Sequence, residues 1–127
     1  MSGVLTVRDE SLDRRHAFEW PLNVLEERKS VRELIRTRIF EEVDRYNAEH
    51  PHSYRGLIHP VADNGQRGRI DRQINQQKQF ELACEAFCQG RIVILIGDVR
   101  ADDLDEEFDV APGTTVTFLR LTLIVGG

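Results

Sequence analysis

Two short runs near the N-terminus have the character of β-strands. Val4–Val7 is rich in β-branched residues, and His16–Trp20 alternates as a half-buried strand does. The polar run Arg8–Arg15 separates the two runs, and Pro21 ends the second pattern. Because the two runs are close in sequence, they predict an antiparallel β-hairpin.

The clearest helix signal begins at Ser30. Ser30 and Glu33 have the spacing of a capping box, in which the serine hydroxyl accepts a hydrogen bond from the third helical amide and the glutamate reaches back. Apolar residues then recur at helical spacing and form one stripe: Val31, Leu34, Ile35, Ile39, Val43 and Tyr46. Asn47 and Pro51 mark the end of the pattern. It predicts a helix that lies across the hairpin with its stripe inward.

The middle of the chain contains three segments with different patterns of polar and apolar residues. Residues Pro51–Gly68 are polar and without a clear period, which predicts a loop. Ile70–Gln89 has helical periodicity, and Gly90 stands where a left-handed C-cap is expected. Arg91–Ile96 is almost entirely apolar, which predicts a central strand covered on much of both faces.

Two turn signals, Gly97-Asp98 and Pro112-Gly113, flank an acidic segment, Asp102–Asp109. The apolar run Val116–Val125 after the second turn predicts the last strand. The order of elements is therefore two strands, a helix, a loop, a second helix, a strand, a turn and a last strand. It predicts an α+β fold with a mixed sheet and a helix packed on one face.

Length and composition suit one globular domain over residues 1–127, with 40% hydrophobic and 31% charged residues. No apolar stretch is long enough to cross a membrane, and the N-terminus lacks the apolar core of a signal peptide, so we expect a cytoplasmic protein. The formal net charge of −5 argues against a nucleic-acid-binding protein, whose binding face is basic.

Residues suited to metal binding or catalysis are few. Cys84 and Cys88 lie four residues apart on the second predicted helix, and we expect both to be reduced and mostly buried. His50, His52 and His59 lie in the polar loop without a metal-ligand spacing, so no metal or cofactor is expected. The chain has no glycine-rich phosphate loop and no nucleophile elbow, which argues against an enzyme.

The chain ends in Gly126-Gly127 directly after the apolar run of the last strand. Glycine has no Cβ, so such a tail can lie extended in a narrow channel. This ending, with the order of elements, resembles the ubiquitin-like β-grasp family and its bacterial-type modifiers. The resemblance covers about 4–48 and 91–127. It implies that about 49–90 is an insertion carrying the second helix.

Three C-terminal segments carry this resemblance. Arg91–Gly97 is similar to the third strand of the family and its glycine turn, and Asp105–Val110 is similar to the short aromatic segment before the last strand. Thr115–Gly127 is similar to the last strand and its tail. The sulfur-carrier branch ends similarly, with a Pro-Gly turn before the last strand and a Val-Gly-Gly terminus.

The resemblance implies a protein substrate whose chemistry lies in the C-terminal carboxylate. An E1-like activating enzyme would adenylate Gly127 with ATP, and carrier enzymes would join it to a side chain of a target protein. The alternatives are a sulfur carrier with a thiocarboxylate at Gly127, or a non-covalent β-grasp interaction module. The implied recognition tail comprises Leu123, Ile124, Val125, Gly126 and Gly127. It has no basic residues, so the channel of its activating enzyme would be apolar.

Alternation along the last strand predicts a second interaction site. If Val116 and Phe118 point into the core, the leucines between and after them point outward. The resemblance implies that this outer face of the sheet binds partners. The predicted patch comprises Ile94, Leu119, Leu121 and Leu123. The alternative is that the second helix or a second copy of the protein covers this face, the latter as a homo-oligomer.

Two further observations bear on the conjugation chemistry. Lys29 and Lys78 are the only lysines, so a chain built on this protein's own amines is limited to these two side chains and the N-terminus. The acidic segment Asp102–Asp109 has two interpretations: a docking surface for a basic partner or a solvated loop.

Overall fold

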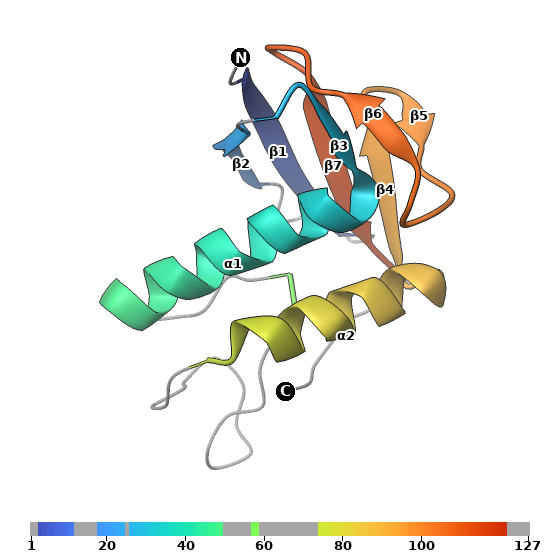
Figure 1. Cartoon of the computed structure of the whole chain (residues 1–127). Coiled ribbons are helices and arrows are strands. Elements are labelled where there is room, and N and C mark those ends of the chain that lie inside the picture. Colours follow the sequence, from blue (N-terminus) through green and yellow to red (C-terminus); the bar gives the residue numbers. More distant parts are fainter. Residues whose placement is uncertain (1–2, 12–17, 25, 50–56, 59–73, 122–127) are drawn as a thin grey trace.

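The computed structural model describes residues 3–11, 18–24, 26–49, 57–58 and 74–121, which form an α+β fold (Figure 1). The strands are β1 (Gly3–Ser11), β2 (Phe18–Val24), β3 (Arg28–Ser30), β4 (Ile92–Ile96), β5 (Val99–Arg100), β6 (Glu107–Asp109) and β7 (Thr115–Arg120). The helices are α1 (Val31–Glu49) and α2 (Gln76–Cys88). Strands β3 and β6 form a separate two-stranded sheet.

The main sheet has five strands in the order β2-β1-β7-β4-β5. β1 and β2 form the predicted antiparallel hairpin, β7 pairs parallel with β1, and β4 pairs antiparallel with both β7 and β5. The prediction of a mixed sheet is therefore confirmed. The last strand of the chain occupies the middle of the sheet, between β1 and β4.

Both strands of the hairpin are longer than predicted. β1 continues through Arg8 to Ser11, and β2 continues past Pro21 to Val24. The prediction that Pro21 ends the second strand is therefore wrong. Since β2 is an edge strand, the missing proline N–H leaves no gap in an inner ladder.

Helix α1 begins as predicted. The Glu33 amide donates to Ser30 Oγ at 3.1 Å, and the Ser30 amide donates to Glu33 Oε1 at 3.2 Å, so the capping box is confirmed. The first two amides of the helix, those of Val31 and Arg32, have no acceptor within the helix and donate to the carbonyls of Glu106 and Leu104. The apolar stripe from Val31 to Tyr46 is buried throughout.

Helix α2 is shorter than the predicted Ile70–Gln89, because Asn75 caps it by accepting a hydrogen bond from the Lys78 amide at 2.9 Å. The predicted left-handed cap at Gly90 is confirmed, with φ of 75°. The Gly90 amide donates to the Phe87 carbonyl and the Arg91 amide to the Ala86 carbonyl, which together form a Schellman motif.

Both predicted turns are confirmed by glycines with positive φ. Gly97 (φ 61°) joins β4 to β5, and Gly113 (φ 83°) precedes β7. The Thr114 amide donates to the Ala111 carbonyl across the second turn. Glycine suits these positions because its lack of a Cβ removes the steric cost of the left-handed backbone.

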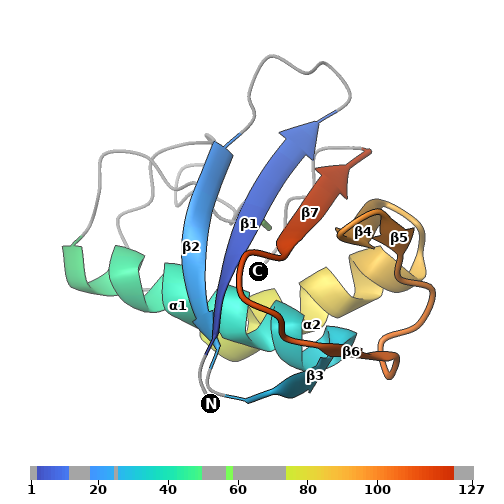
Figure 2. The same cartoon turned by 90° about the horizontal axis from the view of Figure 1, so that it is seen from above.

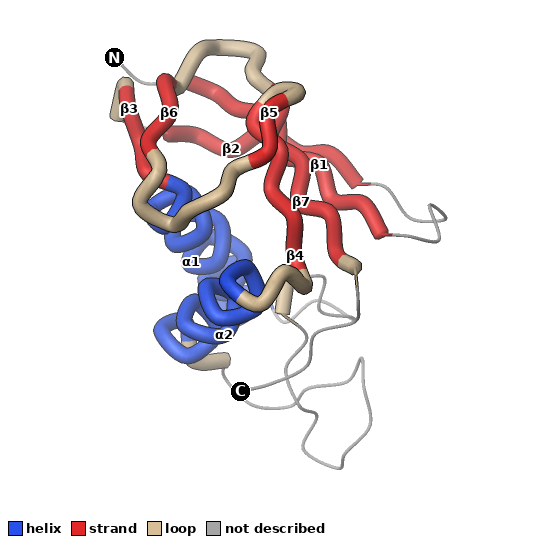
Figure 3. Tube along the Cα trace, turned by 90° about the vertical axis from the view of Figure 1, so that its right-hand side faces the viewer, coloured by secondary structure: helices blue, strands red, loops and turns tan. Residues whose placement is uncertain are grey.

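Both helices lie on the same side of the main sheet (Figure 2, Figure 3). α2 packs against α1 and β4. The alternative that the second helix covers the outer face of the sheet is therefore wrong. The core lies between the sheet and the helices, and its fully buried members include Leu5, Leu22, Leu34, Ile39, Ile94 and Phe118.

Candidate functional site

The predicted functional element is the end of β7 and the tail after it. The strand ladder extends one residue beyond β7, because the Leu121 amide donates to the Arg91 carbonyl at 2.9 Å. Residues 122–127 lie outside the described part of the chain. The recognition tail Leu123–Gly127 and the attachment point Gly127 therefore stay predictions made from the sequence.

The outer face of the sheet beside β7 differs from the predicted patch. Ile94 is fully buried and lies opposite Phe118 across β4 and β7, so it faces the core and its assignment to the patch is wrong. Val93 is the residue opposite Leu119 on the outer face. Leu123 lies outside the described residues. The outer apolar patch, as we define it here, comprises Val93, Leu95, Leu119 and Leu121, all of them half-buried.

The other half of the outer face carries ion pairs. Arg8 on β1 lies opposite Glu19 on β2, and Arg8 Nη1 donates to Glu19 Oε1 at 2.5 Å. Arg8 Nε also donates to Glu10 Oε1 at 2.9 Å. The outer face is thus divided between ion-paired strands β1 and β2 and the outer apolar patch on β7 and β4.

Paired truncations test which side of the sheet each residue occupies. Ile94→Ala should lower the free energy of unfolding by about 2–5 kcal/mol, because it leaves a cavity in the core. Leu119→Ala removes a half-buried side chain, and we expect a loss of about 1 kcal/mol. Urea unfolding followed by circular dichroism measures both values. Equal losses would contradict the assignment of Leu119 to the outer face.

A buried charge cluster lies beneath β7, on the opposite side of the sheet. The Arg38 side chain on α1 is completely buried, and its two terminal nitrogens donate to the two carboxylate oxygens of Asp9 at 2.5 and 2.6 Å. Its Nε donates to Glu42 at 3.4 Å. The guanidinium carbon lies 4.4 Å from the ring centre of Phe118 and 4.9 Å from that of Trp20. Arg38 therefore links α1 to β1, β2 and β7.

The cluster also holds a short segment from the long connection between the helices. The Leu57 amide donates to Glu42 Oε1 at 2.9 Å, and Leu57 and Ile58 are buried. Burial raises the pKa of the Glu42 carboxyl, against the opposing effects of the Arg38 cation and the Leu57 amide. Two carboxylates face one guanidinium, so the cluster carries one excess negative charge when both are ionised.

The raised pKa of Glu42 predicts how stability depends on pH. The folded protein binds the proton of the Glu42 carboxyl more tightly than the unfolded chain does. The contribution of this carboxyl to the free energy of unfolding is therefore greatest below its unfolded pKa of 4.5, and it is lost as the pH rises through the folded pKa. The free energy of unfolding of the wild type, relative to that of Glu42→Gln, should therefore fall as the pH rises from 4.5 to 8. Thermal unfolding of both proteins over this pH range measures the difference. A difference that rises with pH would contradict the prediction.

This cluster was not among the features predicted from the sequence, although the sequence contains two signals for it. Arg38 and Glu42 fall on the same helical stripe as the apolar residues of α1. Asp9 continues the inward alternation of Leu5 and Val7 along β1. A polar residue at an inward position predicts a buried partner, because a buried charge needs an opposite charge and hydrogen bonds.

The acidic segment is neither fully solvated nor free to dock along its whole length. β6 pairs with the basic strand β3, and Arg28 contacts Glu107 at 2.7 Å and Asp109 at 3.6 Å. Arg32 contacts Asp105 at 3.3 Å. These exposed pairs neutralise part of the segment within the protein itself.

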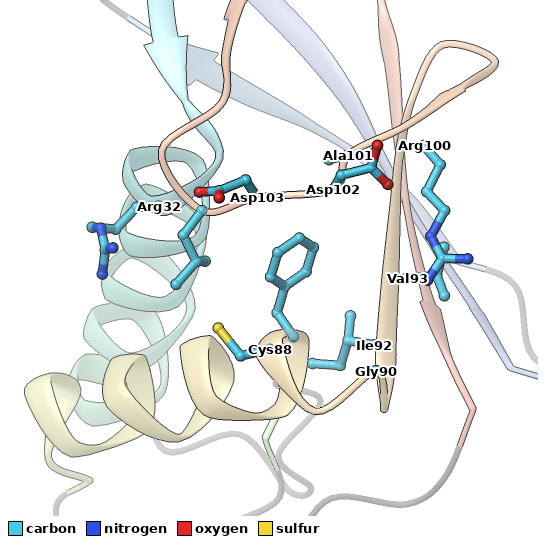
Figure 4. A pocket seen from close by; sticks show the side chains of 11 residues that line it. Arg32, Cys88, Gly90, Ile92, Val93, Arg100, Ala101, Asp102 and Asp103 are labelled. Atoms are coloured by element: carbon cyan, nitrogen blue, oxygen red, sulfur yellow. The ribbon is translucent and has the colours of Figure 1, made fainter.

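A cleft of about 440 Å³ opens between the end of α2, β4 and the segment 101–104 (Figure 4). Its lining includes the apolar Phe87, Ile92 and Leu104, the charged Arg32, Arg100, Asp102 and Asp103, and the thiol of Cys88. The lining carries two positive and two negative side chains, so its formal charges balance.

The two cysteines differ in exposure. Cys84 is buried, and burial raises the pKa of its thiol, so it is a poor nucleophile. Cys88 is exposed beside the cleft, which makes the prediction that both thiols are mostly buried wrong for this residue. Cys88 is the last residue of α2.

In the described part of the chain, no group of three or more His, Cys, Asp or Glu side chains is arranged to hold a metal ion. His50, His52 and His59 lie outside that part. Neither described helix has the length and apolar character needed to cross a bilayer. Comparisons of this chain with protein-family models, with curated proteins and with solved structures find no match.

Proposed function

We propose that this chain is a ubiquitin-like protein modifier with a β-grasp fold. In this proposal an E1-like enzyme adenylates the Gly127 carboxylate with ATP, and carrier enzymes then conjugate it to target proteins. The observation that carries the proposal is the position of the last strand. β7 lies in the middle of the sheet, is anchored on both sides, and is followed by a short segment that ends in Gly126-Gly127.

The topology supports the β-grasp assignment. An N-terminal hairpin, a crossover helix and a last strand inserted parallel to the first agree with the fold that the resemblance implies. The helix α1 lies against the inner face of this sheet, with its apolar stripe buried. α2 follows α1 as an addition to the compact form, within the region expected to be an insertion.

Conjugation is favoured over sulfur transfer by the additional structure. α2 and its contacts with α1 exceed what a minimal sulfur carrier needs to present a thiocarboxylate. One observation supports the alternative hypothesis of a sulfur carrier: the sequence has Pro112-Gly113 before the last strand and Val125-Gly126-Gly127 after it. A non-covalent β-grasp interaction module is the third candidate.

The outer apolar patch is the surface that we propose for binding the activating and carrier enzymes. It lies on β7 and β4, and its member Leu121 is the last described residue of the chain. Its half-buried residues have no helix over them in the described structure. ATP would be bound by the partner enzyme in the cytoplasm, and we propose no cofactor for this chain.

Mass spectrometry of the protein recovered from its source cells tests the proposal. The chain would carry an N-terminal tag, and its covalent products would be examined intact and after digestion. Gly127 joined by an amide or ester bond to another protein's side chain is the expected result. A free chain with one carboxyl oxygen replaced by sulfur would establish the carrier. Gly127 unmodified in every growth condition would leave the interaction module.

A further inference from the structure

Strand β2 forms one edge of the main sheet, with β1 on one side and no strand of the described sheet on the other (Figure 2). The Thr6 amide donates to the Thr114 carbonyl at 2.9 Å, and the Val4 carbonyl accepts from the Gly113 amide at 3.3 Å. The main-chain groups of Thr6 therefore point toward β7. Since Thr6 lies opposite Pro21, this pair exchanges no hydrogen bond between β1 and β2. The nitrogen and the carbonyl of Pro21 thus point away from β1.

The side of β2 turned away from β1 is its free edge. Main-chain groups alternate in direction along a strand, so those of Glu19 and Asn23 point to the free edge together with those of Pro21. Glu19 and Asn23 each offer an N–H and a carbonyl there. Pro21 offers only a carbonyl, because proline has no N–H. The middle donor of the free edge is therefore missing.

In every other respect β2 is suited to pair with the same strand of a second copy. The strand has 7 residues, Pro21 is the middle one, and Glu19 is the only charged one. In an antiparallel pair centred on Pro21, Glu19 lies opposite Asn23 of the second copy, so the two carboxylates do not meet. The apolar residues meet one another: Phe18 with Val24, and Trp20 with Leu22. Short strands with such a pattern, little charge and no proline pair readily with copies of themselves.

We infer that Pro21 prevents a second copy of this chain from pairing with the free edge of β2. The central pair of that arrangement is one that would exchange hydrogen bonds, and with proline in both copies it has no donor. Two carbonyls would lose water without gaining a partner, which is costlier than the mere absence of a bond. Proline on an edge strand is one of the features by which sheets avoid edge-to-edge pairing. The inference does not depend on the proposed function.

The opposite edge of the sheet is protected in a different way. β5 comprises only Val99 and Arg100, and a strand this short offers too few main-chain groups for stable pairing. β2 is therefore the edge at which a single residue decides whether the sheet can extend into a second molecule.

Amide hydrogen exchange of the full-length chain, followed by NMR, tests the direction of the main-chain groups. The Trp20 and Leu22 amides point toward β1, and the Glu19 and Asn23 amides point to the free edge. After correction for intrinsic rates, we expect Trp20 and Leu22 to exchange at least about tenfold more slowly than Glu19 and Asn23. Equal protection of the two sets in the wild type would overturn the inference.

Pro21→Val restores the missing donor and leaves the ladder with β1 unchanged. The Pro21 side chain is exposed, so the variant should fold, which circular dichroism checks. We expect its dimer dissociation constant, measured by analytical ultracentrifugation, to be at least about tenfold lower than that of the wild type, because the central pair gains two hydrogen bonds. The Glu19 and Asn23 amides should become protected in the dimer. Pro21→Thr, which restores the donor with a polar side chain, should behave in the same way.

Asn23→Val is the matched control. Asn23 is exposed on the same face of β2, so the variant adds the same apolar side chain without adding a donor. We expect it to associate no more strongly than the wild type. Equal association of Asn23→Val and Pro21→Val would assign the effect to the side chain and overturn the inference. Wild-type affinity in both Pro21 variants would also overturn it, as would dimers in which the Glu19 and Asn23 amides stay unprotected.

Discussion

Arg38→Ala is expected to lower the free energy of unfolding by about 3–5 kcal/mol, the range for breaking a buried ion pair by removing one partner. The variant leaves the Asp9 carboxylate buried without its bidentate guanidinium, and it removes the contacts with Trp20 and Phe118. Urea unfolding at neutral pH measures the loss.

A double variant distinguishes the ion pair from simple packing. Asp9→Leu together with Arg38→Met removes both charges and keeps much of the volume, so most of the stability should return. All proteins are compared in a Glu42→Gln background, which removes the third charge and keeps an acceptor for the Leu57 amide. A double variant as unstable as the sum of the two single variants would show that Asp9 and Arg38 are not coupled.

Deletion of Gly127 is expected to abolish every covalent conjugate of this chain. Under the proposed function, the deletion moves the terminal carboxylate to Gly126, one residue short of the position at which an activating enzyme would act. Conjugates in cell extracts are counted by their tag after denaturing purification, which removes proteins held only by non-covalent contacts.

Folding provides the control for this deletion. The last described hydrogen bond of the β7 ladder is made by the Leu121 amide, so removal of Gly127 should leave the unfolding midpoint unchanged. Asp102→Asn, an exposed change in the segment beside the cleft, serves as a matched variant that should keep all conjugates. Conjugates that survive the deletion would place the attachment point elsewhere in the chain.

The elements predicted best from the sequence are those whose signals lie within a few residues. Ser30 and Glu33 contact each other within one helical turn, and Gly90 satisfies the last carbonyls of α2 through its own local backbone. The turns at Gly97 and Gly113 are local in the same sense. Such features need no distant partner, so the sequence is sufficient to locate them.

The membership of the outer apolar patch could not be predicted from the sequence. β4 is apolar at every position, so the sequence contains no alternation that assigns Val93 and Ile94 to different faces. The antiparallel register with β7 makes that assignment, because Phe118 must face the core and Ile94 lies opposite it. A shift of one residue would exchange the two faces.

The sequence by itself determined the α+β class, the hairpin, the capped helix α1 and the turns, because each depends on neighbouring residues or on one periodicity. It also carries the Gly126-Gly127 terminus on which the proposed function rests. Only the tertiary structure decided that Arg38 is buried against Asp9, that α2 leaves the outer face of the sheet uncovered, and that Lys29 is inaccessible while Lys78 is exposed. These outcomes depend on contacts between residues far apart in the chain, and burial in the folded protein sets the chemistry of each side chain.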